Sequence, residues 1–154
     1  MSKFIVISLF SFALLFTACS DNNVLYTKAY TFKNNTWEQD VKPVFKVEIK
    51  DTSLYYTMNV TIRITTDYLN SNLWFFMHSK APNGETGREP YEVKVANPDG
   101  SWSGKTTGTI VENTVSFKHR KFPQKGIYYF TFEQGITEKT ITNIMDISCS
   151  VSVD

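Results

Sequence analysis

The chain of 154 residues is long enough for one domain with a sizeable core. Its 16 basic and 15 acidic side chains nearly cancel, which argues against nucleic acid as a partner, because binding to phosphates needs a surplus of positive charge. Phe, Trp and Tyr make up 15% of the residues. This content favours strands, since aromatic side chains suit the half-buried surface of a pleated sheet.

The first 18 residues have the pattern of a secretory signal peptide. Lys3 precedes an apolar run over residues 4–16, which contains only two serines among its thirteen residues. This run is too short to span a bilayer, for which about 20 residues are needed, but it suits the apolar region of a signal peptide. Thr17 and Ala18 are small, as a signal peptidase requires beside the cleaved bond. We therefore predict that residues 1–18 are a signal peptide.

Cys19 directly follows these small residues and is predicted to be a lipid-attachment cysteine. The lipoprotein pattern has an aliphatic residue three positions earlier, where this chain has Phe16. Two or more acyl chains on Cys19 would anchor the protein stably, and residues 19–23 would form the lipidated cysteine and a polar tether that lets the domain stand off the bilayer. Ordinary secretion with a coincidental cysteine is the alternative. Lipidation would leave Cys149 without a disulfide partner.

Residues 24–154 are predicted to form one β-domain, because apolar and polar side chains alternate along most of this stretch. The expected strands lie near residues 25–32, 43–50, 54–66, 73–80, 91–95, 115–119, 127–133 and 145–153. Turn residues separate these segments, and no amphipathic helix is apparent. The pattern predicts an all-β fold: an antiparallel β-sandwich of eight or nine strands, with a jelly roll as one form of it.

The three tryptophans have different surroundings in the sequence. Trp74 belongs to the segment 73–80, which is apolar on both faces and is therefore expected to be a central strand with Trp74 in the core. Trp37 and Trp102 lie in polar or glycine-rich stretches, where their rings are open to exposure. An exposed ring that stacks on a sugar would indicate a glycan-binding surface, whereas ordinary core packing is the competing interpretation.

No catalytic or metal-binding constellation stands out. His78 and His119 are the only histidines, and neither has a second ligand at the spacing of a zinc site, so we predict neither a metal nor a cofactor. Residues 100–104 read Gly-Ser-Trp-Ser-Gly, whereas a nucleophile elbow needs serine at the centre. Cys149 is expected to be a buried thiol on the last strand. We predict that the protein is not an enzyme.

Scattered carboxylates leave one enzymatic hypothesis open. Two of them could pair in space for glycoside hydrolysis, and the acidic residues considered are Glu38, Asp40, Asp67, Asp99 and Glu133.

A basic run over residues 118–121, Lys-His-Arg-Lys, precedes a turn. This run is either a solvated loop or a contact with lipid headgroups or an acidic partner.

Several loop and turn motifs follow one another in a distinctive order. They are Asp67-Tyr68 with Ser71-Asn72-Leu73, Pro82-Asn83-Gly84, Pro98-Asp99-Gly100-x-Trp102-x-Gly104-Lys105-x-x-Gly108, and Phe122-Pro123-x-x-Gly126-x-Tyr128-x-Phe130-x-x-Glu133-Gln134. In this order and spacing, and together with Cys19, they resemble the gliding motility lipoprotein GldH family from about residue 24 to the C-terminus.

The resemblance implies a lipoprotein in the envelope of a Gram-negative bacterium, at the outer membrane. It further implies a non-enzymatic role in gliding motility or in the secretion apparatus linked to it, with other envelope proteins as partners. Cys19 is the only residue to which the resemblance gives a defined role, that of lipid attachment. Loop and turn residues are predicted to form the partner surface, with turn stabilisation as their alternative role; they are Asp67, Tyr68, Asn70, Asn72, Asp99, Trp102 and Lys105. A glycan-binding lipoprotein and a small envelope hydrolase remain the competing hypotheses.

Overall fold

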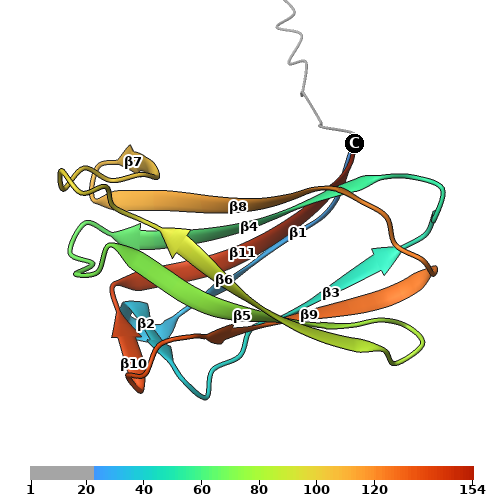
Figure 1. Ribbon diagram of the computed structural model, residues 1–154, viewed down its shortest axis with the longest axis horizontal. Coiled ribbons are helices and arrows are strands. Elements are labelled where there is room, and N and C mark those ends of the chain that lie inside the picture. Colours follow the sequence, from blue (N-terminus) through green and yellow to red (C-terminus); the bar gives the residue numbers. More distant parts are fainter. Residues whose placement is uncertain (1–22) are drawn as a thin grey trace, which may run out of the picture.

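The computed structural model describes residues 23–154, which form an antiparallel β-sandwich (Figure 1). The predicted signal peptide, Cys19 and all but the last residue of the predicted tether lie outside the described residues. The elements are β1 (Val24–Thr31), the 3-10 turn η1 (Lys33–Asn35), β2 (Thr36–Glu38), β3 (Val44–Ile49), β4 (Tyr56–Thr65), β5 (Asn72–Lys80), β6 (Thr86–Lys94), β7 (Lys105–Thr107), β8 (Ile110–Arg120), β9 (Gly126–Gln134), β10 (Thr140–Thr142) and β11 (Ile144–Val153).

Two sheets make up the sandwich, and a third, small sheet closes one end. The larger sheet has the order β1-β11-β4-β8-β7, the sheet facing it has the order β3-β9-β5-β6, and β10 pairs with β2. Among the eight long strands the first pairs with the last, β3 with β9, β4 with β8, and β5 with β6. This nested pairing is that of a jelly roll, so the predicted fold class is confirmed.

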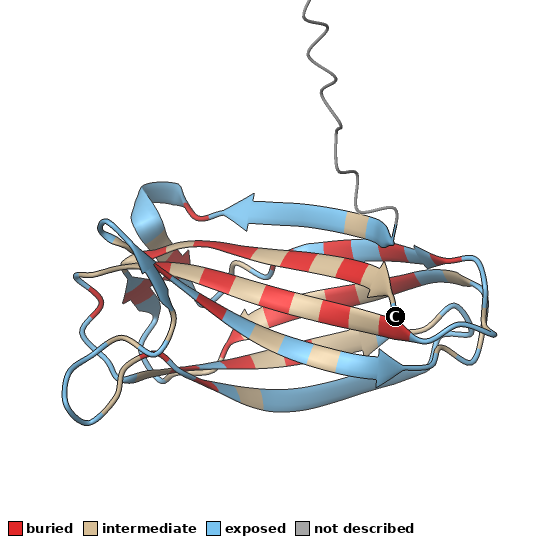
Figure 2. Ribbon diagram, turned by 90° about the horizontal axis from the view of Figure 1, so that it is seen from above, coloured by how far each residue is buried: buried red, intermediate tan, exposed pale blue. Residues whose placement is uncertain are grey.

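The core lies between the two sheets because each long strand alternates in polarity. In β4, Met58, Val60, Ile62 and Ile64 are buried while the residues between them are partly exposed, and this striping is visible in Figure 2. β11 repeats the pattern with Cys149 on its buried face and serines on the other. A period of two places successive side chains on opposite faces of a sheet, so the alternation in the sequence corresponds to these faces, except at the start of β11, where the register shifts between Ile144 and Asp146 and Asp146 is buried.

The β2–β10 pair buries Trp37, which the sequence had left open to exposure. The ring has no exposed surface and stacks on Phe32, with 4.8 Å between the ring centroids. Its Nε1 donates a hydrogen bond of 2.8 Å to the carbonyl oxygen of Val41. The polar neighbours of Trp37 face solvent on a short strand, and β10 covers that strand through Ile141, which pairs with Trp37.

Trp74 is not in the core, and the expectation from the sequence is wrong at this residue. β5 is central, since it pairs with β6 and β9, but only one face of its sheet packs against the other sheet. Leu73, Phe75 and Met77 occupy that inner face, and Trp74 on the outer face keeps 39% of its surface exposed.

The long strands run between two ends of the sandwich. The end named here the entry end contains the start of β1 and the turns at residues 50–55, 81–85 and 121–125, because Val24 pairs with Ser152 and Tyr56 pairs with Arg120. The opposite, loop end contains residues 66–71 and 95–104 and the β2–β10 pair. In Figure 1 the entry end is on the right and the loop end on the left. Residues 23–154 contain no helix with the length and hydropathy of a membrane span.

Candidate functional site

The loop end brings together the two segments that contain the predicted partner residues. The backbone amides of Val95 and Ala96 donate hydrogen bonds of 2.9 and 3.1 Å to the carbonyl oxygen of Ser71. These bonds hold the 95–104 segment against the 66–71 loop. Residues expected to form one surface are therefore neighbours, although they are separated by about thirty positions in the chain.

Part of this set holds the loops in place. Tyr68 is buried and its hydroxyl donates a hydrogen bond of 2.9 Å to the carbonyl oxygen of Asn72. The Asn72 side chain donates to Glu92 Oε1 at 2.7 Å. Burial raises the pKa of the Tyr68 hydroxyl, which stays neutral. Tyr68 therefore stabilises the loop from inside, whereas Asp67 and Asn70 remain exposed beside it.

The 95–104 segment has a similar division. Asp99 accepts hydrogen bonds from the hydroxyl and the amide of Ser101, at 2.6 and 3.0 Å, and these bonds lower the pKa of its carboxyl group. Trp102 is half-buried against the core. A Cβ atom at Gly104 would lie 2.4 Å from the carbonyl oxygen of Glu112, so only glycine fits there. Asp99 acts as a turn residue, while exposed Lys105 is free to contact a partner.

Leu69 is a loop-end residue that the sequence interpretation missed. It is 90% exposed at the tip of the 66–71 loop. An apolar residue within a polar loop was the available signal. Its exposure adds an apolar contact to the polar residues predicted for this surface.

The outer face of the β3-β9-β5-β6 sheet presents one exposed aromatic ring, Trp74, and two partly buried ones, Phe76 and Tyr129. Trp74 and Phe76 are successive outward-facing residues of β5. Pro90 lies opposite Phe76 on β6, and Tyr129 lies on β9. We name these four residues the aromatic face. The guanidinium carbon of Arg88 lies 3.5 Å from the centroid of the Phe76 ring, a cation–π contact that leaves the charge at the surface.

A charged cluster borders the aromatic face. Glu133 Oε2 lies 2.7 Å from His78 Nε2 and 3.3 Å from Lys42 Nζ. Partial burial opposes ionisation of Glu133, but the hydrogen bonds from His78 and Lys42 outweigh it and lower the pKa of the carboxyl group. The cluster therefore presents an ionised carboxylate held between two nitrogen groups.

Two hollows on the surface of residues 23–154 contain carboxylates and were considered as enzymatic sites. One hollow of about 210 Å³ lies toward the entry end and is lined mainly by Met and aromatic side chains, with Glu89 as its carboxylate. The Glu89 carboxylate is hydrogen-bonded to the Tyr91 hydroxyl. Glu38 and Asp40 line another hollow together, but both are exposed, whereas the general acid of a glycosidase is set in a less polar environment.

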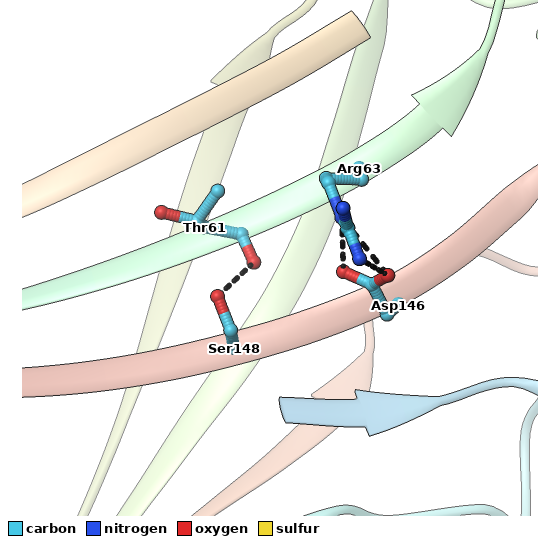
Figure 3. Close-up of polar contacts among 4 residues, drawn as sticks. All are labelled: Thr61, Arg63, Asp146 and Ser148. Carbon is cyan, nitrogen blue, oxygen red and sulfur yellow. Dashed lines mark hydrogen bonds and ion pairs between the residues drawn. The ribbon is translucent and has the colours of Figure 1, made fainter. Parts of the chain in front are cut away.

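Other polar groups of the larger sheet have structural partners (Figure 3). Arg63 Nε donates to both carboxylate oxygens of Asp146 at 3.0 Å, and Ser148 lies beside Thr61 one step along the same pair of strands. Cys149 is fully buried, and burial raises the pKa of its thiol to about 12, so it is a packing residue rather than a nucleophile. Residues 23–154 contain no group of three His, Cys, Asp or Glu side chains that could hold a metal ion.

The sequence profile of the GldH lipoprotein family matches residues 24–151. The chain is similar to the gliding motility lipoprotein GldH of Flavobacterium johnsoniae, with 28% identity over 127 residues that cover 82% of this chain and 77% of the relative. No solved structure matches the fold. Because the family profile spans nearly the whole described domain, the chain belongs to the GldH lipoprotein family.

Proposed function

We propose that the protein is a non-enzymatic adaptor of the cell envelope that supports gliding motility or the secretion machinery linked to it. Membership of a lipoprotein family implies lipid anchoring in the envelope, and we assign the lipid to Cys19 and the location to the outer membrane. The adaptor binds another envelope protein through the aromatic face. The name of the relative from Flavobacterium johnsoniae supports the link to gliding.

The exposed ring of Trp74, beside Phe76, is the observation that carries the proposal. A sheet whose outer face meets only water normally presents polar side chains there, as the larger sheet does with its serines and threonines. Trp and Tyr are enriched among residues that dominate binding energy at protein interfaces, because they bury a large area and lose little conformational entropy. The aromatic face has this composition, with Arg88 over the Phe76 ring and Glu133 opposite Phe76 on β9.

The loop end supplies a second part of the contact surface in this proposal. Asp67, Asn70, Lys105 and Leu69 are exposed there, whereas Tyr68 and Asp99 stabilise the loops. Trp74 lies near the loop-end half of β5, since its neighbour Asn72 begins that strand. A partner could therefore contact the aromatic face and the 66–71 loop together.

The test is an affinity purification of the acylated protein from cross-linked envelopes. Trp74→Ala is the variant, and Tyr30→Ala is its control, because Tyr30 on β1 is 41% exposed and belongs to the other sheet. Loss of a central Trp costs about 2 kcal/mol of binding, or roughly a 30-fold weaker complex. We expect envelope proteins to co-purify with wild type and Tyr30→Ala and to be lost with Trp74→Ala. Equal recovery with all three would refute the assignment to this face.

A glycan is the second candidate occupant, because an exposed indole beside the polar Asn72–Glu92 pair suits a sugar ring. Trp37 and Trp102, the rings that the sequence left open to exposure, are poorly placed to stack on a sugar, since Trp37 is fully buried and Trp102 is half-buried against the core. Recovery of polysaccharide rather than protein, with dependence on Trp74, would favour this candidate. A Cys19→Ala variant separates both outcomes from binding that merely needs membrane attachment.

A further inference from the structure

The entry end exposes apolar side chains where the chain enters the domain. Leu25 near the start of β1, and Leu54 and Tyr55 in the 50–55 turn, are between 37% and 51% exposed. Leu25 and Leu54 line the same hollow with Tyr56 and Val153. These side chains therefore gather next to the point where the segment from Cys19 joins the fold.

Basic side chains surround these apolar residues. The turns of the entry end, with the three strand residues on either side, contain seven of them against four acidic ones, although the chain as a whole is nearly neutral; the basic residues are Lys50, Lys80, Arg88, Lys118, Arg120, Lys121 and Lys125, and the acidic residues are Glu48, Asp51, Glu85 and Asp154.

Two of the acidic groups of this end have hydrogen-bond partners. Asp51 accepts hydrogen bonds from Ser53, and Asp154 accepts from the Thr57 hydroxyl at 2.6 Å and from His119 at 3.2 Å. The basic groups are exposed. Lys50 pairs weakly with Glu48 at 3.6 Å, both side chains being well exposed, and such a pair contributes little. The entry end therefore presents net positive charge to its surroundings.

The short segment between Cys19 and the fold limits how far this end can lie from a membrane. Asn23 follows Cys19 by four residues, and a fully extended chain covers at most about 3.6 Å per residue, or roughly 14 Å in total. Adjacent strands are about 4.8 Å apart. Arg120 on β8 is three strands from Val24 on β1, so these two residues are also roughly 14 Å apart across the sheet. Charges at this range interact with a surface across about one to two Debye lengths at physiological salt.

We propose that the entry end lies against the anionic headgroups of the membrane that holds the lipid on Cys19. The proposal rests on lipid attachment at Cys19. Basic residues bind the headgroup phosphates, and Leu25, Leu54 and Tyr55 enter the interfacial layer, where side chains with apolar and polar parts are favoured. The strands then run outward from the bilayer, so the loop end points away from it and the aromatic face stays open to a partner.

The test measures the orientation of the acylated protein in vesicles. A fluorophore is attached at Thr52→Cys on the entry end and, as a matched control, at Thr109→Cys on the loop end; buried Cys149 and acylated Cys19 do not react with it. Nitroxide-labelled lipids quench the fluorophore. Vesicles contain phosphatidylcholine with or without phosphatidylglycerol. We expect stronger quenching at position 52 than at position 109, and a difference between the two positions that increases when phosphatidylglycerol is present; a difference that does not depend on phosphatidylglycerol would overturn the binding of anionic headgroups.

Variants in which three charges are neutralised measure how much the basic side chains contribute to the orientation. Each basic side chain near an anionic surface contributes roughly a fivefold preference for the docked orientation. The variant with Lys118→Gln, Arg120→Gln and Lys121→Gln is therefore expected to shift the orientational equilibrium about 100-fold, and the variant with Lys94→Gln, Lys105→Gln and Lys139→Gln at the loop end is expected to leave it unchanged.

The outcomes separate this inference from the lipid attachment. Equal quenching at the two positions, stronger quenching at position 109, or an unchanged signal in the entry-end variant would overturn the inference while the protein still floats with the vesicles. Mass spectrometry that finds no acyl chain on Cys19 would overturn the inference together with the attachment.

Discussion

Two tryptophans test directly which surfaces of the sandwich are core and which are solvent-facing. Trp37→Ala removes a fully buried ring that stacks on Phe32 and donates to Val41. Burial of this kind makes a Trp→Ala change cost about 3–5 kcal/mol. Trp74→Ala removes a ring on the outer face that is 39% exposed, and a surface change of this kind is expected to cost about 1 kcal/mol or less.

Thermal unfolding followed by circular dichroism measures the difference. A domain of about 130 residues unfolds with an entropy of roughly 0.28 kcal/mol/K, so the Trp37 variant should lose about 11–18 °C in Tm and the Trp74 variant less than about 4 °C. Near-ultraviolet spectra should change more for Trp37→Ala, because its ring is fixed in the core. Equal losses of Tm for the two variants would refute the assignment of Trp74 to the outer face.

Three further stability predictions follow from the titratable groups. Burial gives the Cys149 thiol a folded pKa of about 12, above the unfolded value of about 8.5; its stabilisation is therefore complete below about pH 8.5 and is lost as pH rises, by about 2–3 kcal/mol at pH 10.5. Urea unfolding should show a steeper alkaline loss for wild type than for Cys149→Ala, and parallel curves would contradict the burial. The lowered pKa of Glu133 has the opposite sign: its stabilisation is present above the unfolded pKa of about 4.3 and is lost as pH falls through the folded pKa. The stability gap between wild type and Glu133→Gln should therefore close as pH is lowered from 6 to 3, and a gap that widens would exclude the ion-pair cluster. Asp146→Asn leaves Arg63 without its carboxylate and should cost about 1–3 kcal/mol; in a double-mutant cycle with Arg63→Gln the costs should be less than additive, whereas full additivity would show that the pair does not interact.

The larger sheet could be predicted from the sequence because its strands have one wet face. Period-two alternation in the segments that became β4 and β11 correctly indicated a buried face for Met58, Val60, Ile62 and Ile64 of β4 and for the thiol of Cys149. The short strands β2, β7 and β10 were not expected, since three residues are too few to show a period. The structure therefore has eleven strands between residues 23 and 154, where the sequence predicted eight or nine.

The candidate surface was harder to predict, for a physical reason. Apolar residues on both faces of a strand indicate burial on both faces, and Trp74 was assigned to the core on that ground. The same pattern arises when an outer face is built to meet a partner, and a single sequence does not distinguish the two cases. Residues of the 66–71 and 95–104 loops were assigned to one partner surface from the sequence, but the contact between the loops and the inward position of Tyr68, with its hydrogen bond to Asn72, are seen only in the structure.

In-cell photo-cross-linking from position 76 tests whether a partner binds through the aromatic face. Benzoylphenylalanine in place of Phe76 preserves an aromatic ring on the aromatic face, and the same residue in place of Thr27, exposed on β1 of the other sheet, is the control. We predict a discrete adduct with an envelope protein from position 76 and none from position 27. An adduct from position 27 alone, or none from position 76 in cells that produce the lipidated protein, would contradict binding of a partner through the aromatic face.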